Sequence, residues 1–568
     1  MNKNISKLIG FLLIVAIVLS FFIEYVSNTK NEIANSGYSQ IEAITFLENE
    51  EIFDSGFINT SNHKKTSLIT WLNYLLFKLF NFDKIFVVYT FKFLELLSIV
   101  LSSIYLFKAL NIKNYVIASI TFTTISIATN FFDPNWASYG AIFNGEWYTF
   151  PDSLLLVSLG LIIKKKYELN LICLLIVILI HPSKGFAFAL VFIPIYLIAL
   201  NKSYVSLNRV AGFSIFNIFI FWMWSQFFYP ETNLFMSNQS WLKIMSLQNY
   251  HFVNDLINLN FVIKEILPII FFAFLISNIF VKKNIQFIGY IFFVVSLLGI
   301  FFDYSEYSFL IKLALHRNSV NIVQIFFISI IYYIFKNKKK STVPVALFTI
   351  VILNQLNYVG IYESYYLISM SLILDKVYFL KKERLIKNLS IFRENNLLII
   401  LSSVLLVVNI SNNIEGKTLS EIINPEKSSY LILQEWAKEN TPEGTVFHPD
   451  PNIDYAWRDF SERSSFGTPR EFVTSWIYTE DLEIFNESVE RLSIYDDKSN
   501  ELILSLEIEE YGEYFSKRYY ENEDMSIFLK LSKLWNVEYF IWDKMYNIPE
   551  ILTIVFETDE HFVLKIKE

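Results

Sequence analysis

The chain alternates between long apolar runs and short polar segments along most of its length. A helix needs about 20 apolar residues to cross the hydrocarbon core of a bilayer, with a workable range of about 17 to 25. Thirteen runs are candidates by this measure, although the two short runs around His181, and the pair around Gly360, are each compatible with a re-entrant pair. The pattern therefore predicts an α-helical polytopic membrane protein with about 11 to 13 transmembrane helices, near 8–26, 85–107, 115–131, 147–163, 168–182, 185–200, 209–228, 262–281, 285–302, 318–336, 342–359, 362–378 and 395–411.

Basic residues follow every second run, which indicates the orientation of the helices. Short cytoplasmic loops are enriched in Lys and Arg. The first run is long and has no small-residue cleavage pattern after it, so we interpret it as a retained helix with its N-terminus in the cytoplasm. An odd number of spans then places the C-terminal part outside. The clusters are Lys108/Lys113, Lys164–Lys166, Lys202/Arg209, Lys282–Lys283, Lys336/Lys338–Lys340 and Lys381–Arg384.

The first outer loop, 27–84, is the longest of the predicted outer segments. Its second half, 68–80, carries an apolar stripe that is too short to span a bilayer and is rich in aromatic residues. This pattern is typical of a helix that lies on the membrane surface.

Composition and charge divide the chain into two parts. Hydrophobic residues make up 54% of it and charged residues 18%, against about 25% charged in soluble domains, which supports a membrane protein. Residues 412–568 hold 33 acidic and 15 basic residues, a net charge of −18, whereas the first 411 residues have a net charge of +10. The single cysteine, Cys173, excludes a disulfide framework and a cysteine-based metal site. Neither part has a nucleic-acid-binding signature.

The acidic tail has the pattern of a small α/β domain. We predict a helix over 428–439, a short strand over 445–447, a helix, turn and strand over 529–542, and a terminal hairpin from 552–556 and 561–566. The predicted organisation is a transmembrane domain over 1–411, a linker over 412–427 and an extracytoplasmic α/β domain over 428–568.

This layout resembles the GT-C superfamily of membrane glycosyltransferases. Two local patterns sharpen the resemblance. The first is the segment 435–442 followed by a strand, which is similar to the junction that opens the outer domain of oligosaccharyltransferase catalytic subunits and of bacterial relatives. The second is the pair of segments 181–185 and 315–319, which are similar to motifs of those bacterial proteins. The Trp-Trp-Asp-x-Gly acceptor motif is absent, which argues against protein N-glycosylation. The first loop also lacks the adjacent acidic pair of protein mannosyltransferases.

The resemblance implies sugar transfer from a polyprenyl-phosphate donor, which requires a general base, cations for the leaving phosphate and an apolar groove. Outer-loop acids are usually only solvated, an arginine at a helix end often snorkels to lipid headgroups, and His181-Pro182 is also compatible with a simple tight turn. No carboxylate cluster marks a metal site, and a divalent cation is left open. The candidates are Asp54 and Asp133 as catalytic carboxylates, with Glu146 as a further outer carboxylate, and Arg317, His316, His181 and Lys184 as ligands of the lipid phosphate.

Two other groups carry charge where it is unusual. Lys92 and Glu95 lie three residues apart within the second predicted span, so they form either a neutralising pair or part of an ion pathway. In the tail, 454–459 combines aromatic and charged side chains, as sugar sites do, but a structural turn is the favoured interpretation.

The leading hypothesis is a glycosyltransferase-like protein of the bacterial cytoplasmic (inner) membrane, acting on its outer face. Its partners are membrane lipid, a polyprenyl-phosphate-linked donor and a glycan or other envelope acceptor. The alternatives are a transporter or flippase of lipid-linked saccharides, which would predict inverted repeats that the sequence does not show, and a non-catalytic envelope assembly factor. The absence of Walker and dinucleotide loops gives ATP-driven transport and redox chemistry no support.

Overall fold

The structure is a computed structural model of the chain. The residues that it describes are 3–26, 28–36, 40–57, 66–128, 146–228, 287–291, 293–295, 298, 319–336, 343–355, 364, 366–372, 394–414, 421, 425–453, 457–472, 482–495, 508–521 and 525–567.

Within these ranges the N-terminal part is helical, and its helices match the predicted apolar runs. Only three are long and apolar enough to cross a membrane by themselves: Lys84–Ala109, Pro182–Asn201 and Leu207–Gln226. The number of spans therefore stays a prediction, and the run at 262–281 lies outside the described residues. The helices are α1 (Lys3–Phe21) with the π-helical turn η1 (Phe22–Val26), α6 (Lys84–Ala109), α7 (Tyr115–Ala128), α8 (Glu146–Ile163), α9 (Tyr167–Ile180), α10 (Pro182–Asn201), α11 (Leu207–Phe228), α17 (Ser319–Lys336), α18 (Val343–Gln355) and α20 (Glu394–Ile414).

These helices pack around one apolar core, to which α6, α7, α8, α10, α17 and α20 all contribute buried side chains. Other apolar side chains face outward. Ile215 and Ile218 on α11 are 67% and 68% exposed, and Leu197 on α10 is 61% exposed. A large exposed apolar surface is costly in water, so this outer face is suited to contact with lipid.

The first loop forms short helices: α2 (Thr29–Ser36), α3 (Ile41–Glu48), the 3₁₀ turn η2 (Glu50–Phe53) and α5 (Leu68–Phe80). Helix α5 coincides with the predicted surface helix. Ser67 caps its N-terminus by accepting a hydrogen bond from the backbone N–H of Ile69, and Asn81 ends it in the left-handed conformation, at φ 50°.

The C-terminal tail is an α/β domain with a five-stranded sheet in the order β2-β1-β3-β5-β4. Strand β1 is parallel to β2 and β3, whereas β5 is antiparallel to β3 and β4. The predicted strand near 445–447, the helix–turn–strand unit and the terminal hairpin are all present. The elements are α22 (Ser429–Asn440), β1 (Val446–His448), α23 (Trp457–Ser461), β2 (Ser464–Ser465), α25 (Leu482–Ser493), α27 (Ile508–Tyr520), α28 (Ser526–Trp535), β3 (Val537–Asp543), β4 (Leu552–Glu557) and β5 (His561–Ile566).

Buried charges join the first loop to the tail. The Arg458 guanidinium lies against the carboxylates of Glu471 and Glu42, and donates to the carbonyl of Phe57. The backbone N–H of Glu42 donates to Asp459 at 3.0 Å. Arg458 and Glu42 are at most 1% exposed, so this contact is fully desolvated. The segment 454–459 is described only from residue 457, and there Trp457, Arg458 and Asp459 are buried, in agreement with the structural interpretation.

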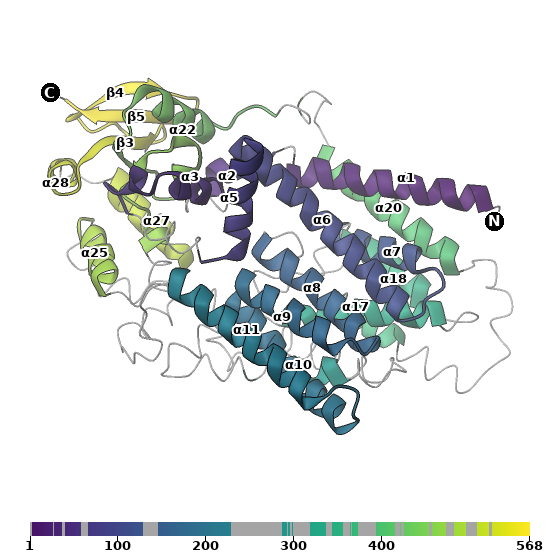
Figure 1. Ribbon diagram of the computed structural model, residues 1–568. Coiled ribbons are helices and arrows are strands. Elements are labelled where there is room, and N and C mark those ends of the chain that lie inside the picture. Colours follow the sequence, from purple (N-terminus) through teal and green to yellow (C-terminus); the bar gives the residue numbers. More distant parts are fainter. Residues whose placement is uncertain are drawn as a thin grey trace.

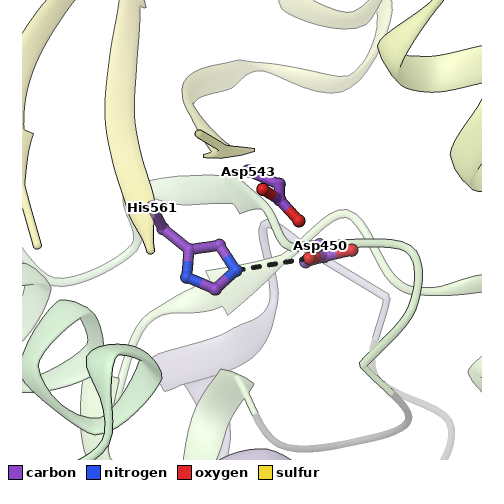
Figure 2. A group of neighbouring side chains, drawn as sticks. All are labelled: Asp450, Asp543 and His561. Atoms are coloured by element: carbon purple, nitrogen blue, oxygen red, sulfur yellow. Dashed lines mark ion pairs between the residues drawn. The ribbon is translucent and has the colours of Figure 1, made fainter. Parts of the chain in front are cut away.

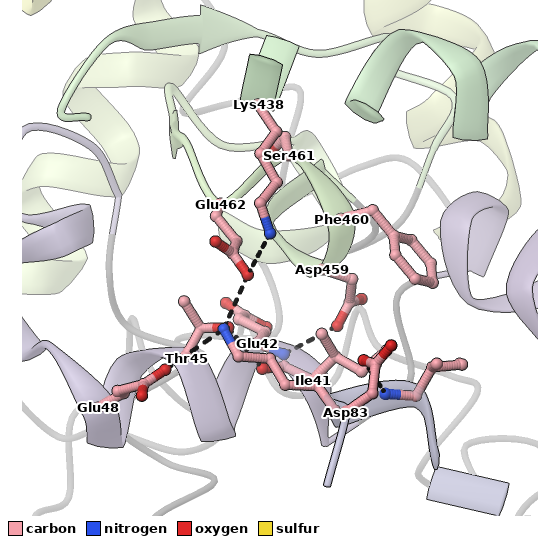
Figure 3. Close-up of polar contacts among 12 residues, drawn as sticks. Ile41, Glu42, Thr45, Glu48, Asp83, Lys438, Asp459, Phe460, Ser461 and Glu462 are labelled. Carbon is pink, nitrogen blue, oxygen red and sulfur yellow. Dashed lines mark hydrogen bonds and ion pairs between the residues drawn. The ribbon is translucent and has the colours of Figure 1, made fainter. Parts of the chain in front are cut away.

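A second ionic contact ties the tail to the start of α6. Lys84 Nζ lies 2.7 Å from Glu462 and 3.6 Å from Glu48, and Lys438 reaches the same Glu462 oxygen at 2.9 Å (Figure 3). Figure 1 shows the sheet and α22 at one end of the molecule, beside α2, α3 and α5, with α6 extending away from them. We call this the domain-facing end of the helices.

Lys164 and Lys165, which follow the fourth predicted span, lie at the opposite end. Lys164, after α8, sits 4.2 Å from the ring centroid of Tyr105 near the end of α6. Lys165 sits 3.7 Å from the ring of Tyr204, which follows α10. The ends of α6, α8 and α10 therefore lie close together at this end of the helices.

Candidate functional site

A one-residue connection between α9 and α10 places His181 at the domain-facing end. His181 caps α10, with its Nδ1 3.5 Å from the backbone N of Lys184 and 3.1 Å from Ser183 Oγ. The two helices approach so closely that a Cβ on Gly185 would lie 2.5 Å from the Ile178 Cα. Only glycine fits at that position. The predicted tight turn is thus the observed one.

Surface helix α5 covers this turn. Ser67 Oγ donates to the carbonyl of Ile180 at 2.8 Å, and Trp224 Nε1 of α11 donates to the carbonyl of Thr66 at 2.9 Å. Apolar side chains of α3, α5 and α6, among them Ile44 and Ile69, pack with Ile180. The first loop therefore closes over the end of the helices where His181 lies.

A buried polar cluster lies beneath the turn, where three helices meet. Lys184 Nζ is 2.8 Å from Asp152 Oδ1, Asn321 Nδ2 donates to the same oxygen at 3.0 Å, and Gln324 Nε2 donates to Asp152 Oδ2 at 3.2 Å. All four side chains are at most 5% exposed. Asp152 comes from α8, Lys184 from the first turn of α10, and the two amides from the first two turns of α17. We call these four residues the Asp152 cluster.

Aromatic and polar groups extend the Asp152 cluster on two sides. Lys184 Nζ lies 5.1 Å from the ring centroid of Tyr148, whose ring is 5.0 Å from that of His181. On the side of α6, Glu95 accepts a hydrogen bond from Thr149 at 2.9 Å and is itself buried. In the predicted Lys92/Glu95 pair, the Glu95 carboxylate is therefore hydrogen-bonded to Thr149 of α8.

In the Asp152 cluster, a buried ammonium and a buried carboxylate neutralise each other within the apolar helix bundle. An ammonium has three N–H donors, and Asp152 accepts from Lys184 through one of them. Asn321 Oδ1 is buried and has no hydrogen-bond partner within the described part of the chain. Buried charges at membrane depth are costly and usually mark function, whereas a fully paired group can also be purely structural.

The predicted site residues divide into three groups. His181 and Lys184 come together at the α9–α10 turn. Asp54 lies elsewhere: it follows η2, which packs against α3 and β2, and its side chain is exposed. Asp133, His316 and Arg317 lie outside the described residues, although the last two directly precede α17 in the sequence.

Three members of the Asp152 cluster were missed from the sequence. Asp152, Asn321 and Gln324 sit within predicted spans, whereas the search for a carboxylate concentrated on the outer loops. The available signal was the position of Asp152 itself, because an ionisable residue inside an apolar helix is a functional candidate by default.

Comparison with known proteins yields a distant likeness to a solved structure. No family model and no curated protein sequence match this chain. A solved structure, described as ArnT from Cupriavidus metallidurans bound to undecaprenyl phosphate, is similar over 98% of this chain and 97% of its own, with a TM-score of 0.45 and 12% identity. At this TM-score and identity, the likeness concerns the general path of the chain and assigns no role to any residue.

Proposed function

We propose that the chain is a polytopic membrane glycosyltransferase of GT-C type, which transfers a sugar from a polyprenyl-phosphate carrier to an envelope acceptor on the outer face of a bacterial cytoplasmic membrane. The observation that carries this proposal is the Asp152 cluster, which sets a lysine and its partners among apolar helices beneath a covering loop. A lipid phosphate is an anion joined to a long apolar tail. In this proposal the lysine contacts the phosphate and the apolar helices contact the tail.

In this proposal Lys184 is the cation that meets the carrier phosphate, with His181 beside it. Asp152 holds the ammonium in place through the 2.8 Å ion pair, and Asn321 and Gln324 hold Asp152. Neutralising a leaving phosphate stabilises the charge that develops in the transition state. Arg317 and His316 precede the helix that carries Asn321, so we retain both as further phosphate ligands.

The acceptor needs a carboxylate to take its proton. Asp54 and Asp133 remain the proposed candidates for this base. Asp152 is a poorer candidate, since it already accepts hydrogen bonds from three side chains and faces a lysine.

Binding of undecaprenyl phosphate to the purified protein tests the proposal. We expect saturable binding in native mass spectrometry, and Lys184→Gln to weaken it at least tenfold, about 1.4 kcal/mol. Lys164→Gln is the matched control, because it removes an exposed lysine from the opposite end of the helices. Equal binding by both variants would remove Lys184 from the phosphate site, and no binding by the unaltered protein would contradict the proposed carrier.

Transfer itself is measured in proteoliposomes supplied with lipid-linked sugars extracted from bacterial membranes. Asp54→Asn and Asp133→Asn are expected to retain carrier binding and lose transfer, as a base that acts only on the acceptor should. A variant that keeps full transfer is not the base.

A further inference from the structure

Three side chains of types that can bind metals meet where the carboxyl ends of β1 and β3 lie beside the start of β5. They are far along the chain from the Asp152 cluster. Parallel strands β1 and β3 end at this edge of the sheet, and the antiparallel strand β5 begins there. Asp450 follows β1, Asp543 is the last residue of β3 and His561 is the first of β5. Asp543 and His561 are directly paired across the two strands, so their side chains lie on the same face.

The three side chains converge closely enough to share one ion. One ligand atom from each lies within 4.8 Å of the others, and His561 Nε2 is 3.5 Å from Asp450 Oδ2 (Figure 2). Backbone N–H groups fix one oxygen of each carboxylate: Asn452 donates to Asp450 Oδ1 and Met545 donates to Asp543 Oδ1, both at 2.8 Å. The second oxygen of each carboxylate is thus left for another partner.

Burial leaves one ring nitrogen of His561 without a partner. Asp450 is 4% exposed and His561 9% exposed. His561 Nδ1 has no hydrogen-bond partner in the described part of the chain. Burial, and after it the negative charge of Asp450, raises the pKa of both tyrosines, so both phenols sense that carboxylate.

Placing Asp450 and Asp543 close together costs free energy unless a cation binds between them. Two carboxylates held close together in a mostly buried site repel each other, and unsatisfied buried polar atoms each cost about 1 to 3 kcal/mol. A cation bound between the carboxylates removes this repulsion. The surrounding domain, with a net charge of −18, also raises the local concentration of cations.

We propose that Asp450, Asp543 and His561 bind a divalent transition-metal ion, of the Mn²⁺ or Zn²⁺ class, at the edge of the tail sheet. The imidazole selects against Ca²⁺ and Mg²⁺, which prefer oxygen ligands only, and the two carboxylates suit Mn²⁺ and Zn²⁺. Three protein ligands leave coordination positions for water or for an anionic group of another molecule, and Asp543 is the half-buried member through which such a group would enter. The ion would also join β1, β3 and β5 at their shared edge.

The test is Mn²⁺ binding to the full-length protein in detergent, after a chelator has removed any bound metal. Binding is measured as the loss of the free Mn²⁺ signal in electron paramagnetic resonance. We expect one tight site, with nitrogen coupling from His561 in the pulsed spectrum and displacement by Zn²⁺. Asp543→Asn should weaken binding at least about tenfold, and His561→Gln should remove the nitrogen coupling. Asp559→Asn removes the same charge from an exposed position of the same hairpin, and it should bind as the unaltered protein does.

Melting temperatures measured with and without Mn²⁺ show whether a variant is folded and whether the ion stabilises it. Mn²⁺ should raise the melting temperature of the unaltered protein and of Asp559→Asn, but not of Asp543→Asn. Absence of binding, or equal weakening in Asp543→Asn and Asp559→Asn, would overturn the proposal and leave the contact between Asp450 and His561 as a structural one. Neither readout depends on sugar transfer or on a lipid carrier, so the outcome is independent of the function proposed above.

Discussion

Lys184 and Asp152, 32 residues apart in the sequence, form an ion pair of 2.8 Å in which both side chains are almost completely buried. Removing one member of a buried pair leaves an uncompensated charge and typically costs about 3 to 5 kcal/mol. The pair therefore constrains the packing of α8 against α10 at the proposed site.

We expect strong coupling between these two residues. Asp152→Asn and Lys184→Gln should each lower the melting temperature, while the double variant should lose less than the sum of the two. A double-mutant cycle on thermal unfolding in detergent measures this coupling, expected at about 1 to 3 kcal/mol. Additive losses would show that the ion pair contributes little.

Gly185→Ala should separate α9 from α10. Its Cβ would meet the Ile178 backbone at 2.5 Å, and overpacking of this kind costs about 1 to 3 kcal/mol. The melting temperature and the binding of undecaprenyl phosphate should both fall, because His181 and Lys184 lie at the same turn. Gly212→Ala in α11 is the control: nothing lies within 4 Å of its Cβ, so this variant should be neutral or slightly stabilising.

Arg458→Met should loosen the contact between the first loop and the tail. The substitution keeps an unbranched apolar stem but leaves the buried carboxylates of Glu42 and Glu471 without this cation, at a cost of about 3 to 5 kcal/mol. Hydrogen exchange of α3 and α23 should rise. Arg518→Met, which removes an exposed arginine from α27, should leave exchange unchanged, and similar exchange in the two variants would refute the role given to Arg458.

Acid should destabilise the tail through His448. This imidazole is stacked on Tyr519, with ring centroids 4.3 Å apart, and forms a hydrogen bond with the hydroxyl of Tyr495. Burial lowers the pKa of His448 to about 4. The unfolded chain, with a pKa of about 6.5, binds the proton first. Stability is therefore complete above pH 6.5 and is lost as the pH falls toward 4, by about 3 kcal/mol at most.

Substitution by phenylalanine isolates this contribution from that of the many carboxylates. His448→Phe should flatten the dependence of the melting temperature on pH between 6.5 and 4, relative to the unaltered protein. Parallel curves for the two proteins would rule out His448 as the group responsible.

Local elements were predictable because their signals lie in neighbouring residues. The surface helix Leu68–Phe80 is bounded by Ser67 and Asn81, and the terminal hairpin alternates around the turn at Asp559, so each is readable over a short window. The site was only half predictable. His181 and Lys184 stand in one motif, but Asp152, Asn321 and Gln324 come from two other helices and have no local pattern that joins them.

The sequence by itself determined the succession of apolar runs, the basic residues that follow alternate runs, and the contrast between a basic helical part and an acidic tail, because periodicity, hydrophobicity and charge are properties of the chain. Only the tertiary structure decided which partner each buried charge meets. Asp152 with Lys184, Arg458 with Glu42, and Asp450 with Asp543 and His561 are brought together by helix packing and strand order across 32 to more than 400 residues. Such contacts depend on how distant segments close on one another, and spacing along the chain does not encode them.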